Sequence, residues 1–269
     1  MNNKYNEVLA NLTAPDQTFA FEEVEHSSGI TYREFTNTPK TLANFFEFGL
    51  MFPEWEFIVF NDERYSYQDI YKKVAQTANA LKNAGVKKGD RVAICMANNP
   101  EYIISFMAAT SMGAVCVLLN SWWVPDEVSY GLENSGAIVL IGDEKRLKGL
   151  EKFTELKKIV VRPVNDLNDY EDFNEFIGSQ SETFSEPSLN THDNATIFYT
   201  SGSTGFPKGV LSTHRNILST LFSWALVTTL KREVEDTDNN SESQSADEVP
   251  KQQAAILHCV PLFHVTGSH

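Results

Sequence analysis

The sequence predicts an α/β fold, with a mostly parallel sheet flanked by helices, and three observations support this prediction. From about residue 91 onward, short apolar runs alternate with stretches that have helical periodicity. The apolar runs are continuous, which is typical of strands buried on both faces of a sheet. The chain has 269 residues, of which 42% are hydrophobic and 12% aromatic, so it can bury a sizeable core.

The part that precedes this alternation has weaker patterns. Residues 1–40 are polar and predict an extended lead-in, which we place in a segment spanning residues 1–56. The run Phe57–Phe60 predicts a strand, and Tyr65–Tyr67 predicts its return strand after a polar turn. Apolar residues at helical spacing then predict a helix over Tyr67–Ala84.

The alternating part predicts repeated strand–helix units. The predicted strands are 91–96, 114–119, 137–141, 158–162 and 195–199. The predicted helices between them are 100–112, 126–134 and 145–155. A helix over 214–230 and a strand over 254–260 are predicted to follow. Two polar segments interrupt this order. Residues 178–194 predict an exposed connector, and residues 231–253, rich in Ser, Asn, Asp and Glu, predict a mobile acidic surface loop.

The uncharged stretch from Tyr102 to Pro125 has to be weighed as a membrane span, because a spanning helix needs about 20 apolar residues. Gly113 interrupts it, and the sequence changes there from helix-favouring to strand-favouring residues. We therefore expect a buried helix, a glycine turn and a buried strand, and no transmembrane segment.

Charge and cysteine content exclude several classes of partner. The net charge of −14 disfavours nucleic acid, which needs clustered Lys and Arg. Cys95, Cys116 and Cys259 show no metal-ligand spacing and give no disulfide framework, so we expect buried free thiols in a reducing compartment. The first residues lack the pattern of a secretory signal, and we expect a cytoplasmic protein.

The most informative segment is Ala195–Val210, in which a strand leads into a run of Ser, Thr and Gly that is followed by Phe-Pro-Lys-Gly. Glycines let backbone N–H groups approach an anion closely, and successive N–H groups form a concave nest for phosphate oxygens. Hydroxyl groups add neutral donors, and Lys208 supplies a positive charge. This turn predicts a polyphosphate ligand.

Other motifs fit the turn less well. A Walker loop requires Gly, four residues and Gly-Lys-Ser/Thr, whereas Pro207 follows the four residues after Gly202. A nucleophile elbow requires Gly two residues before the Ser, which neither Ser201 nor Ser203 has. The dinucleotide pattern is absent from the turn, and a flexible linker does not usually follow such a strand.

The run YTSGSTGFPKGV resembles the signature loop of the adenylate-forming (AMP-binding) superfamily, which includes acyl-CoA synthetases. Three further stretches agree in order and spacing: LKNAGVKKGDRVAICMA, MGAVCVLLN and VPLFHVTG. The Ser-Trp-Trp step at 121–123 and the run PLFH are more similar to acyl-CoA synthetases than to amino-acid-activating domains.

The resemblance implies specific site residues and a reaction. His264 would lie where the ATP and acyl sites meet, and the ATP phosphates would be bound by Thr200, Ser201, Gly202, Ser203, Thr204 and Lys208. A carboxylic acid, expected to be a fatty acid, would attack Mg-ATP to give an acyl-adenylate, and coenzyme A would then take the acyl group. Magnesium would arrive with the nucleotide, and no protein metal site is expected.

The resemblance also implies that the sequence holds only part of such an enzyme. Residues 57–269 would be the N-terminal part of the large domain, incomplete at the C-terminus and without the C-terminal domain. The adenine- and ribose-contacting motifs and the late catalytic lysine are missing from these residues. We therefore expect ligase activity from a longer protein. The alternatives are a non-catalytic nucleotide-binding or interaction fragment and an unrelated phosphotransferase. The sequence specifies neither the acid nor the oligomeric state.

Overall fold

The computed structural model describes residues 2–25, 29–165, 169–185, 187–200, 205–238, 253 and 255–264. The chain divides into two compact units, each assembled from separate parts of the sequence. The first comprises Met1–Pro39 and Arg215–Leu257, and the second comprises Lys40–His214 and His258–His269. The extent of the family domain expected over residues 57–269 stays a prediction.

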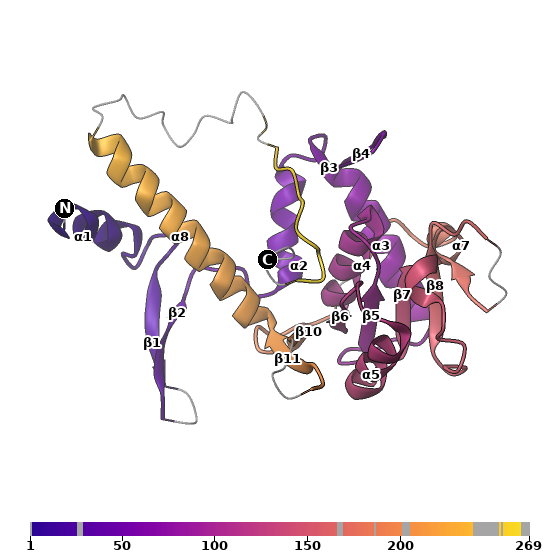
Figure 1. Cartoon of the computed structure of the whole chain (residues 1–269). Helices are drawn as coiled ribbons and strands as arrows, with labels where there is room; N and C mark the ends of the chain where they lie inside the picture. Colours follow the sequence, from indigo (N-terminus) through magenta and orange to yellow (C-terminus); the bar gives the residue numbers. More distant parts are fainter. Residues whose placement is uncertain are drawn as a thin grey trace. The chain divides into compact units, whose positions relative to one another are not determined.

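The second unit is built on a seven-stranded sheet with the order β11-β10-β6-β5-β7-β8-β9 (Figure 1). Its strands are β5 (Arg91–Cys95), β6 (Val115–Leu118), β7 (Val139–Asp143), β8 (Lys157–Val161), β9 (Glu171–Asp172), β10 (Asn194–Thr200) and β11 (Lys208–Thr213). All neighbouring pairs are parallel except β10–β11. The predicted α/β class with a mostly parallel sheet is therefore confirmed.

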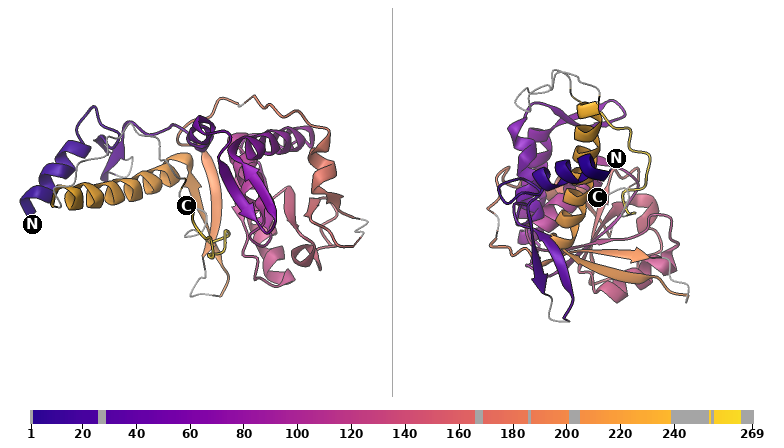
Figure 2. Two further views of the ribbon diagram at one scale, coloured as in Figure 1. Left: turned by 90° about the horizontal axis from the view of Figure 1, so that it is seen from above. Right: turned by 90° about the vertical axis from the view of Figure 1, so that its left-hand side faces the viewer.

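Helices cover both faces of this sheet (Figure 2). The elements are α3 (Tyr67–Asn83), α4 (Pro100–Ser111), α5 (Pro125–Ser135), α6 (Glu144–Leu147) and α7 (Phe173–Gly178). The chain moves from β5 to β6 through α4 and then back past β5 to β7 through α5. Because parallel crossovers are right-handed, the two opposite directions place α4 and α5 on opposite faces. Helix α3 lies beside α4 on the same face.

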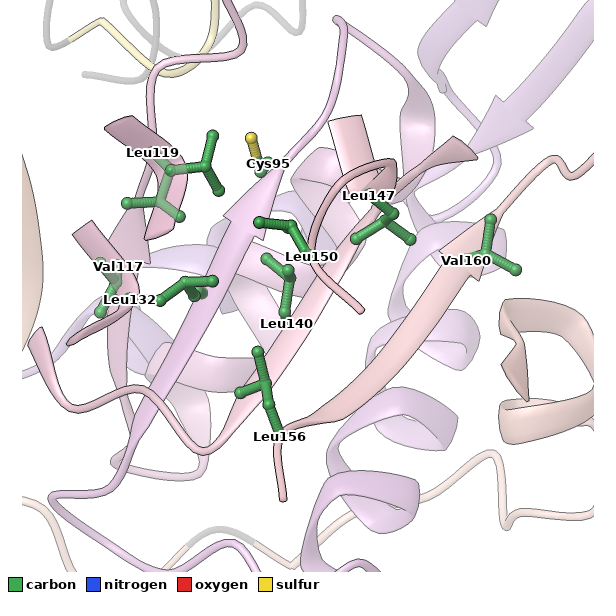
Figure 3. Close-up of a cluster of buried hydrophobic side chains, with 11 residues drawn as sticks. Cys95, Val117, Leu119, Leu132, Leu140, Leu147, Leu150, Leu156 and Val160 are labelled. Carbon is green, nitrogen blue, oxygen red and sulfur yellow. The ribbon is translucent and has the colours of Figure 1, made fainter. Parts of the chain in front are cut away.

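The core between α5 and the sheet is apolar and fully buried (Figure 3). Cys95, Leu119 and Leu140 come from the ends or middles of strands, and Leu132 comes from α5; all are at most 2% exposed. Each buried leucine stabilises the fold by about 2 kcal/mol relative to exposure. This core fixes α5 against β5, β6 and β7.

A hairpin and a capped helix precede the sheet. Strands β3 (Glu56–Phe60) and β4 (Glu63–Ser66) pair antiparallel, and α2 (Leu42–Phe46) and the 3₁₀-helix η1 (Glu47–Met51) lie before them. Ser66 caps α3, because its hydroxyl accepts the N–H of Asp69 at 3.1 Å and the Asp69 carboxylate accepts the N–H of Ser66 at 2.9 Å. The predicted start of this helix at Tyr67 is confirmed.

The stretch weighed as a membrane span folds as expected into α4, a turn and β6. Gly113 in the turn has φ of +81°, a conformation that glycine adopts without strain. Within the described residues, no helix is long and apolar enough to cross a membrane.

The first unit contradicts the expected extended lead-in. Residues 2–35 include α1 (Asn2–Leu12) and the antiparallel strands β1 (Phe21–Glu25) and β2 (Thr31–Phe35). Phe19 and Phe35 lie 6.3 and 6.2 Å from the ring of Phe222, which belongs to α8 (His214–Asp238). These contacts join residues that are far apart in the sequence, so local patterning did not reveal them.

Three predicted elements also differ from the structure, and strand β11 is an addition to the prediction. Helix α8 continues past Leu230 to Asp238, into the segment expected to be a loop, while residues 239–252 lie outside the described residues. The helix predicted over 145–155 ends at Leu147, before Gly149 with φ of +83°. Strand β11 was not predicted. Residues 255–260 form no strand, since their backbone has no neighbouring strand in the described structure to pair with.

The cysteines follow the expectation in two of three cases. Cys95 and Cys116 are buried, and burial raises the pKa of the Cys95 thiol to about 12 and that of Cys116 further. Cys259 is exposed because residues 255–259 lie outside regular structure, so the expectation of a buried thiol was wrong there.

Candidate functional site

The parallel strands bring several polar segments to one edge of the sheet. Strands β5, β6, β7, β8 and β10 run in the same direction, so their carboxyl ends lie together. In open α/β sheets, ligands bind outside this carboxyl edge. Strand β10 ends at Thr200, which places the turn between β10 and β11 at the carboxyl edge.

The described ends of this turn are Thr200 and Lys208. They lie opposite each other in the β10–β11 pair, and the Thr200 hydroxyl donates to the Lys208 carbonyl oxygen at 3.4 Å. The Lys208 side chain is exposed, and in the part of the chain that the structure describes it forms no ion pair. Four of the predicted phosphate-binding residues lie outside the described residues: Ser201, Gly202, Ser203 and Thr204.

Two glycines on the returning arm allow the turn to close. Gly205 has φ of +106°, which favours glycine over any residue with a side chain. A Cβ atom at Gly209 would lie 3.0 Å from Cγ2 of Ile197 and 3.5 Å from the ring of Tyr199. The absence of a side chain at Gly209 therefore leaves space for the side chain of Ile197 on β10.

The segment that carries His264 reaches the same edge. Asn98, just after β5, donates to the Val260 carbonyl at 2.8 Å and accepts the Leu262 N–H at 2.9 Å. The Tyr102 hydroxyl donates to the Leu262 carbonyl at 2.9 Å. The side chain of His264 is exposed, and its backbone N–H donates to Pro261.

Further contacts bind this segment to the end of β6. The rings of Phe263 and Trp122 pack edge to face, with their centroids 5.2 Å apart. Trp122 follows β6, which lies next to β10 in the sheet. Sequence reasoning had not assigned Asn98 or Tyr102, because nothing in the local pattern shows that they bind a segment 160 residues away.

His214, which follows the turn closely in sequence, does not belong to this site. Strand β11 runs back from Lys208 to Thr213, so His214 lies at the opposite edge of the sheet. It is fully buried, and its Nδ1 accepts the N–H of Leu42 at 3.1 Å. Burial lowers the pKa of His214 to about 4, so the imidazole is neutral at physiological pH.

A cavity of about 230 Å³ opens beside the turn that follows β6, and we call it the tryptophan cavity. It is lined by Ser121, Trp122, Trp123, Pro125, Lys145, Arg146 and Lys148. Arg146 is held in place, since Nη1 contacts Asp143 at 3.0 Å and Nε donates to the Ser121 carbonyl at 3.1 Å. The cavity lining carries three basic side chains and no acidic one, which suits an anionic ligand.

No metal centre is formed by the residues within the described ranges: no group of three or more His, Cys, Asp or Glu side chains could hold an ion there. Among the described residues, the ends of the turn offer the Thr200 hydroxyl and the exposed Lys208 ammonium. Such groups are typical phosphate ligands.

The sequence profile of the AMP-binding enzyme family matches residues 45–269. The chain belongs to this family. It is 30% identical over 204 residues to 4-coumarate–CoA ligase 3 of Oryza sativa subsp. japonica, an alignment that covers 76% of the chain and 34% of the relative. The chain thus spans about a third of the length of the curated relatives it matches.

Solved structures of CoA ligases share this fold. The anthranilate CoA ligase AuaEII, in complex with anthranoyl-AMP, matches with a TM-score of 0.63 and 26% identity, over 66% of this chain and 35% of that one. A long-chain-fatty-acid CoA ligase from Rhodopseudomonas palustris CGA009 matches with a TM-score of 0.66 and 23% identity, over 85% and 53%. At that identity the second match supports the fold alone.

Proposed function

We propose that this chain is the phosphate-binding part of an enzyme that activates a carboxylic acid with ATP and transfers it to coenzyme A. The observation that carries the proposal is the position of the β10–β11 turn. Its exposed Lys208 ammonium and its Thr200 hydroxyl lie at the carboxyl edge of a parallel sheet in a member of the AMP-binding enzyme family.

The turn would act by binding and orienting the triphosphate. A carboxylate oxygen of the acid attacks the α-phosphorus, the bond from that phosphorus to the bridging oxygen breaks, and pyrophosphate leaves. Charge builds up on the leaving pyrophosphate, and the Lys208 ammonium group with backbone amides of the turn would stabilise it. Magnesium travelling with the nucleotide would neutralise further phosphate charge. We assign these contacts to Thr200, Ser201, Gly202, Ser203, Thr204 and Lys208.

His264 would line the path of the acid. Asn98 and Tyr102 hold its segment at the ends of β5 and β6, beside the strand that carries the turn. An imidazole in this position can hydrogen-bond a carboxylate without transferring a proton. The relatives that bear on the substrate are named for 4-coumarate and for anthranilate, both of which are carboxylic acids. We therefore propose a carboxylic acid as the substrate, and a fatty acid as the more specific form of this proposal.

The tryptophan cavity would receive the phosphates of coenzyme A. In the second step the thiol of coenzyme A gives up its proton to water, its sulfur attacks the acyl carbon, and AMP leaves with the electrons of the broken C–O bond. Coenzyme A is a second polyanion, and a group of cationic side chains suits its phosphates. Lys145, Arg146 and Lys148 line a cavity at the same edge of the sheet.

The direct test is Mg-ATP binding to the 269-residue chain by isothermal titration calorimetry. Lys208→Ala should weaken binding about tenfold, equivalent to about 1.4 kcal/mol, because it removes a charge-assisted contact to phosphate. The matched control is Lys87→Ala, an exposed lysine that precedes β5 at the amino edge of the sheet and should bind ATP as the wild type does. Equal ATP affinities for Lys208→Ala and the wild type would refute the assignment.

A further inference from the structure

Helix α5 is in contact with both arms of the β10–β11 turn. On the incoming arm, the Tyr199 hydroxyl lies 3.0 Å from the Gly131 carbonyl oxygen and 2.9 Å from Oδ1 of Asn134. Its ring also packs edge to face against Trp123, at 5.4 Å between centroids. The last residues of β10 are thus fastened to α5 before the turn begins.

The returning arm is fastened to the same helix through one side chain. The Tyr130 hydroxyl donates to the Pro207 carbonyl oxygen at 3.2 Å, and the Tyr130 ring stacks on Phe206 with a centroid distance of 4.9 Å and an interplanar angle of 29°. Phe206 is 68% exposed, so burial in the core does not hold it. Pro207 directly precedes Lys208, and these contacts therefore act next to the residue proposed to bind phosphate.

Helix α5 is a rigid support for these contacts. Val128 and Leu132 on its inner face are at most 2% exposed and belong to the core. A Cβ atom at Gly131 would lie 2.7 Å from Cδ2 of Leu119, so the helix packs directly on the end of β6. A side chain on the outer face of α5 is therefore attached to a helix whose position is fixed by the core.

We propose that Tyr130 is a positioning residue for the phosphate-binding turn, which it holds through Phe206 and Pro207 so that Lys208 is oriented before ATP arrives. This inference rests on the proposed function of the turn. Ordering a loop during binding costs affinity, and a loop ordered in advance avoids that cost. Tyr130 contacts no part of the ligand in this scheme and acts on the turn alone.

Three variants test the proposal through binding of Mg-ATP and of inorganic tripolyphosphate to the 269-residue chain. Tyr130→Ala removes both contacts and should weaken both affinities about tenfold, whereas Tyr130→Phe keeps the ring and should weaken them only about threefold. The control is Tyr170→Phe, which removes the hydrogen bond of 2.9 Å from the Tyr170 hydroxyl to the Leu147 carbonyl oxygen. This hydrogen bond does not involve the turn, so the change should leave both affinities unchanged. If Tyr130→Phe keeps part of the affinity that Tyr130→Ala loses, the loss reflects positioning of the turn rather than general damage to the fold.

Amide hydrogen exchange provides a readout that does not need a ligand. In Tyr130→Ala, the amides of Gly205, Phe206, Lys208 and Gly209 should exchange at least about fivefold faster, while those of β5 and β7 keep their wild-type rates. Wild-type exchange at the turn in Tyr130→Ala would overturn the inference whether or not ATP binds. If Lys208→Ala loses ATP affinity but both Tyr130 variants keep it, the positioning role fails and the proposed function stands.

Discussion

Two cavities of similar size in the second unit differ in how their charges are balanced. The first, which we call the Arg162 cavity, has a volume of about 250 Å³ and is lined by Glu63, Tyr65, Lys73, Glu101, Ile104, Arg162, Phe173 and Asn174. The tryptophan cavity has about 230 Å³. Two acidic and two basic side chains line the Arg162 cavity, whereas the charged lining of the tryptophan cavity is entirely basic. Cavity volume alone therefore does not identify a ligand site.

In the Arg162 cavity, the Arg162 guanidinium already forms ion pairs with both acidic side chains of the lining. The Arg162 guanidinium contacts both carboxylate oxygens of Glu63, at 2.6 and 2.8 Å, and its Nε lies 2.9 Å from the Glu101 carboxylate. Arg162 has φ of +51°, which costs about 1 kcal/mol or more for a residue with a side chain. The two ion pairs offset this cost and join the end of β8 to the β3–β4 hairpin and to α4. We interpret this cavity as structural.

In the tryptophan cavity, one of the three cationic side chains forms no ion pair with the described residues. Arg146 contacts Asp143 at 3.0 Å, and Lys148 lies 3.6 Å from Glu144. Lys145 forms no ion pair with any residue that the structure describes. The local excess of positive charge is available to a ligand, which is the difference that separates the two cavities.

The largest expected effect is on stability, from Arg162→Ala. This change removes the guanidinium that bridges Glu63 and Glu101, and we expect a loss of about 2 kcal/mol in the free energy of unfolding. Urea denaturation followed by circular dichroism measures it. Lys145→Ala is the control from the tryptophan cavity and should change the free energy by less than about 0.5 kcal/mol. Equal stability of the two variants would remove the distinction between the cavities.

The sequence predicted the central part of the fold, because there local pattern and tertiary structure agree. Strands β5 and β6 read as apolar runs and are buried on both faces. The composition of the turn after Thr200 predicts a phosphate site, and this stays a prediction. Contacts between residues that are distant in the sequence could not be predicted from local patterns. Arg162 and Glu63 are 99 positions apart, and neither lies in a recognisable motif.

The same limit explains the errors at both ends of the chain. The polar segment before residue 40 folds onto α8 through Phe19 and Phe35, whose partner Phe222 lies in a helix far along the sequence. The run after residue 254 has strand composition, but a strand needs a neighbour, and composition does not supply one. Asn98 instead binds the chain from Val260 to Leu262 through its side chain.

A second prediction concerns ligand affinity in the tryptophan cavity. Lys145→Glu should weaken binding of adenosine 3′,5′-bisphosphate, the phosphorylated nucleotide end of coenzyme A, about fivefold, equivalent to about 1 kcal/mol. Calorimetric titration of the 269-residue chain measures it. Lys87→Glu makes the same charge change at the amino edge and should leave the affinity unchanged. Equal losses in both variants would indicate a general charge effect and no specific site.

The smallest effect is a pH dependence that should belong to the Arg162 cavity alone. Hydrogen bonds from Arg162 and then from Tyr65 lower the pKa of Glu63 from 4.5 to about 2. Because the folded-state pKa lies below the unfolded one, the carboxylate stabilises the fold above pH about 4.5, and this contribution is lost as the pH falls toward 2. The Glu63 side chain is 38% exposed, so solvent screens the pair, and we expect about 1 kcal/mol at pH 7.

Glu63→Gln isolates this contribution, since the amide does not titrate in this range. The stability difference between wild type and Glu63→Gln should be largest at pH 7 and shrink between about pH 5 and pH 2. Glu56→Gln, which alters an exposed carboxylate 3.6 Å from Arg64, is the control and should stay within about 0.5 kcal/mol of wild type throughout. A difference for Glu63→Gln that stays constant from pH 7 to pH 2 would show that Arg162 does not hold this carboxylate ionised. The Arg162 guanidinium would then have N–H donors available for a ligand. Its cavity could then bind an anion as well as the tryptophan cavity could.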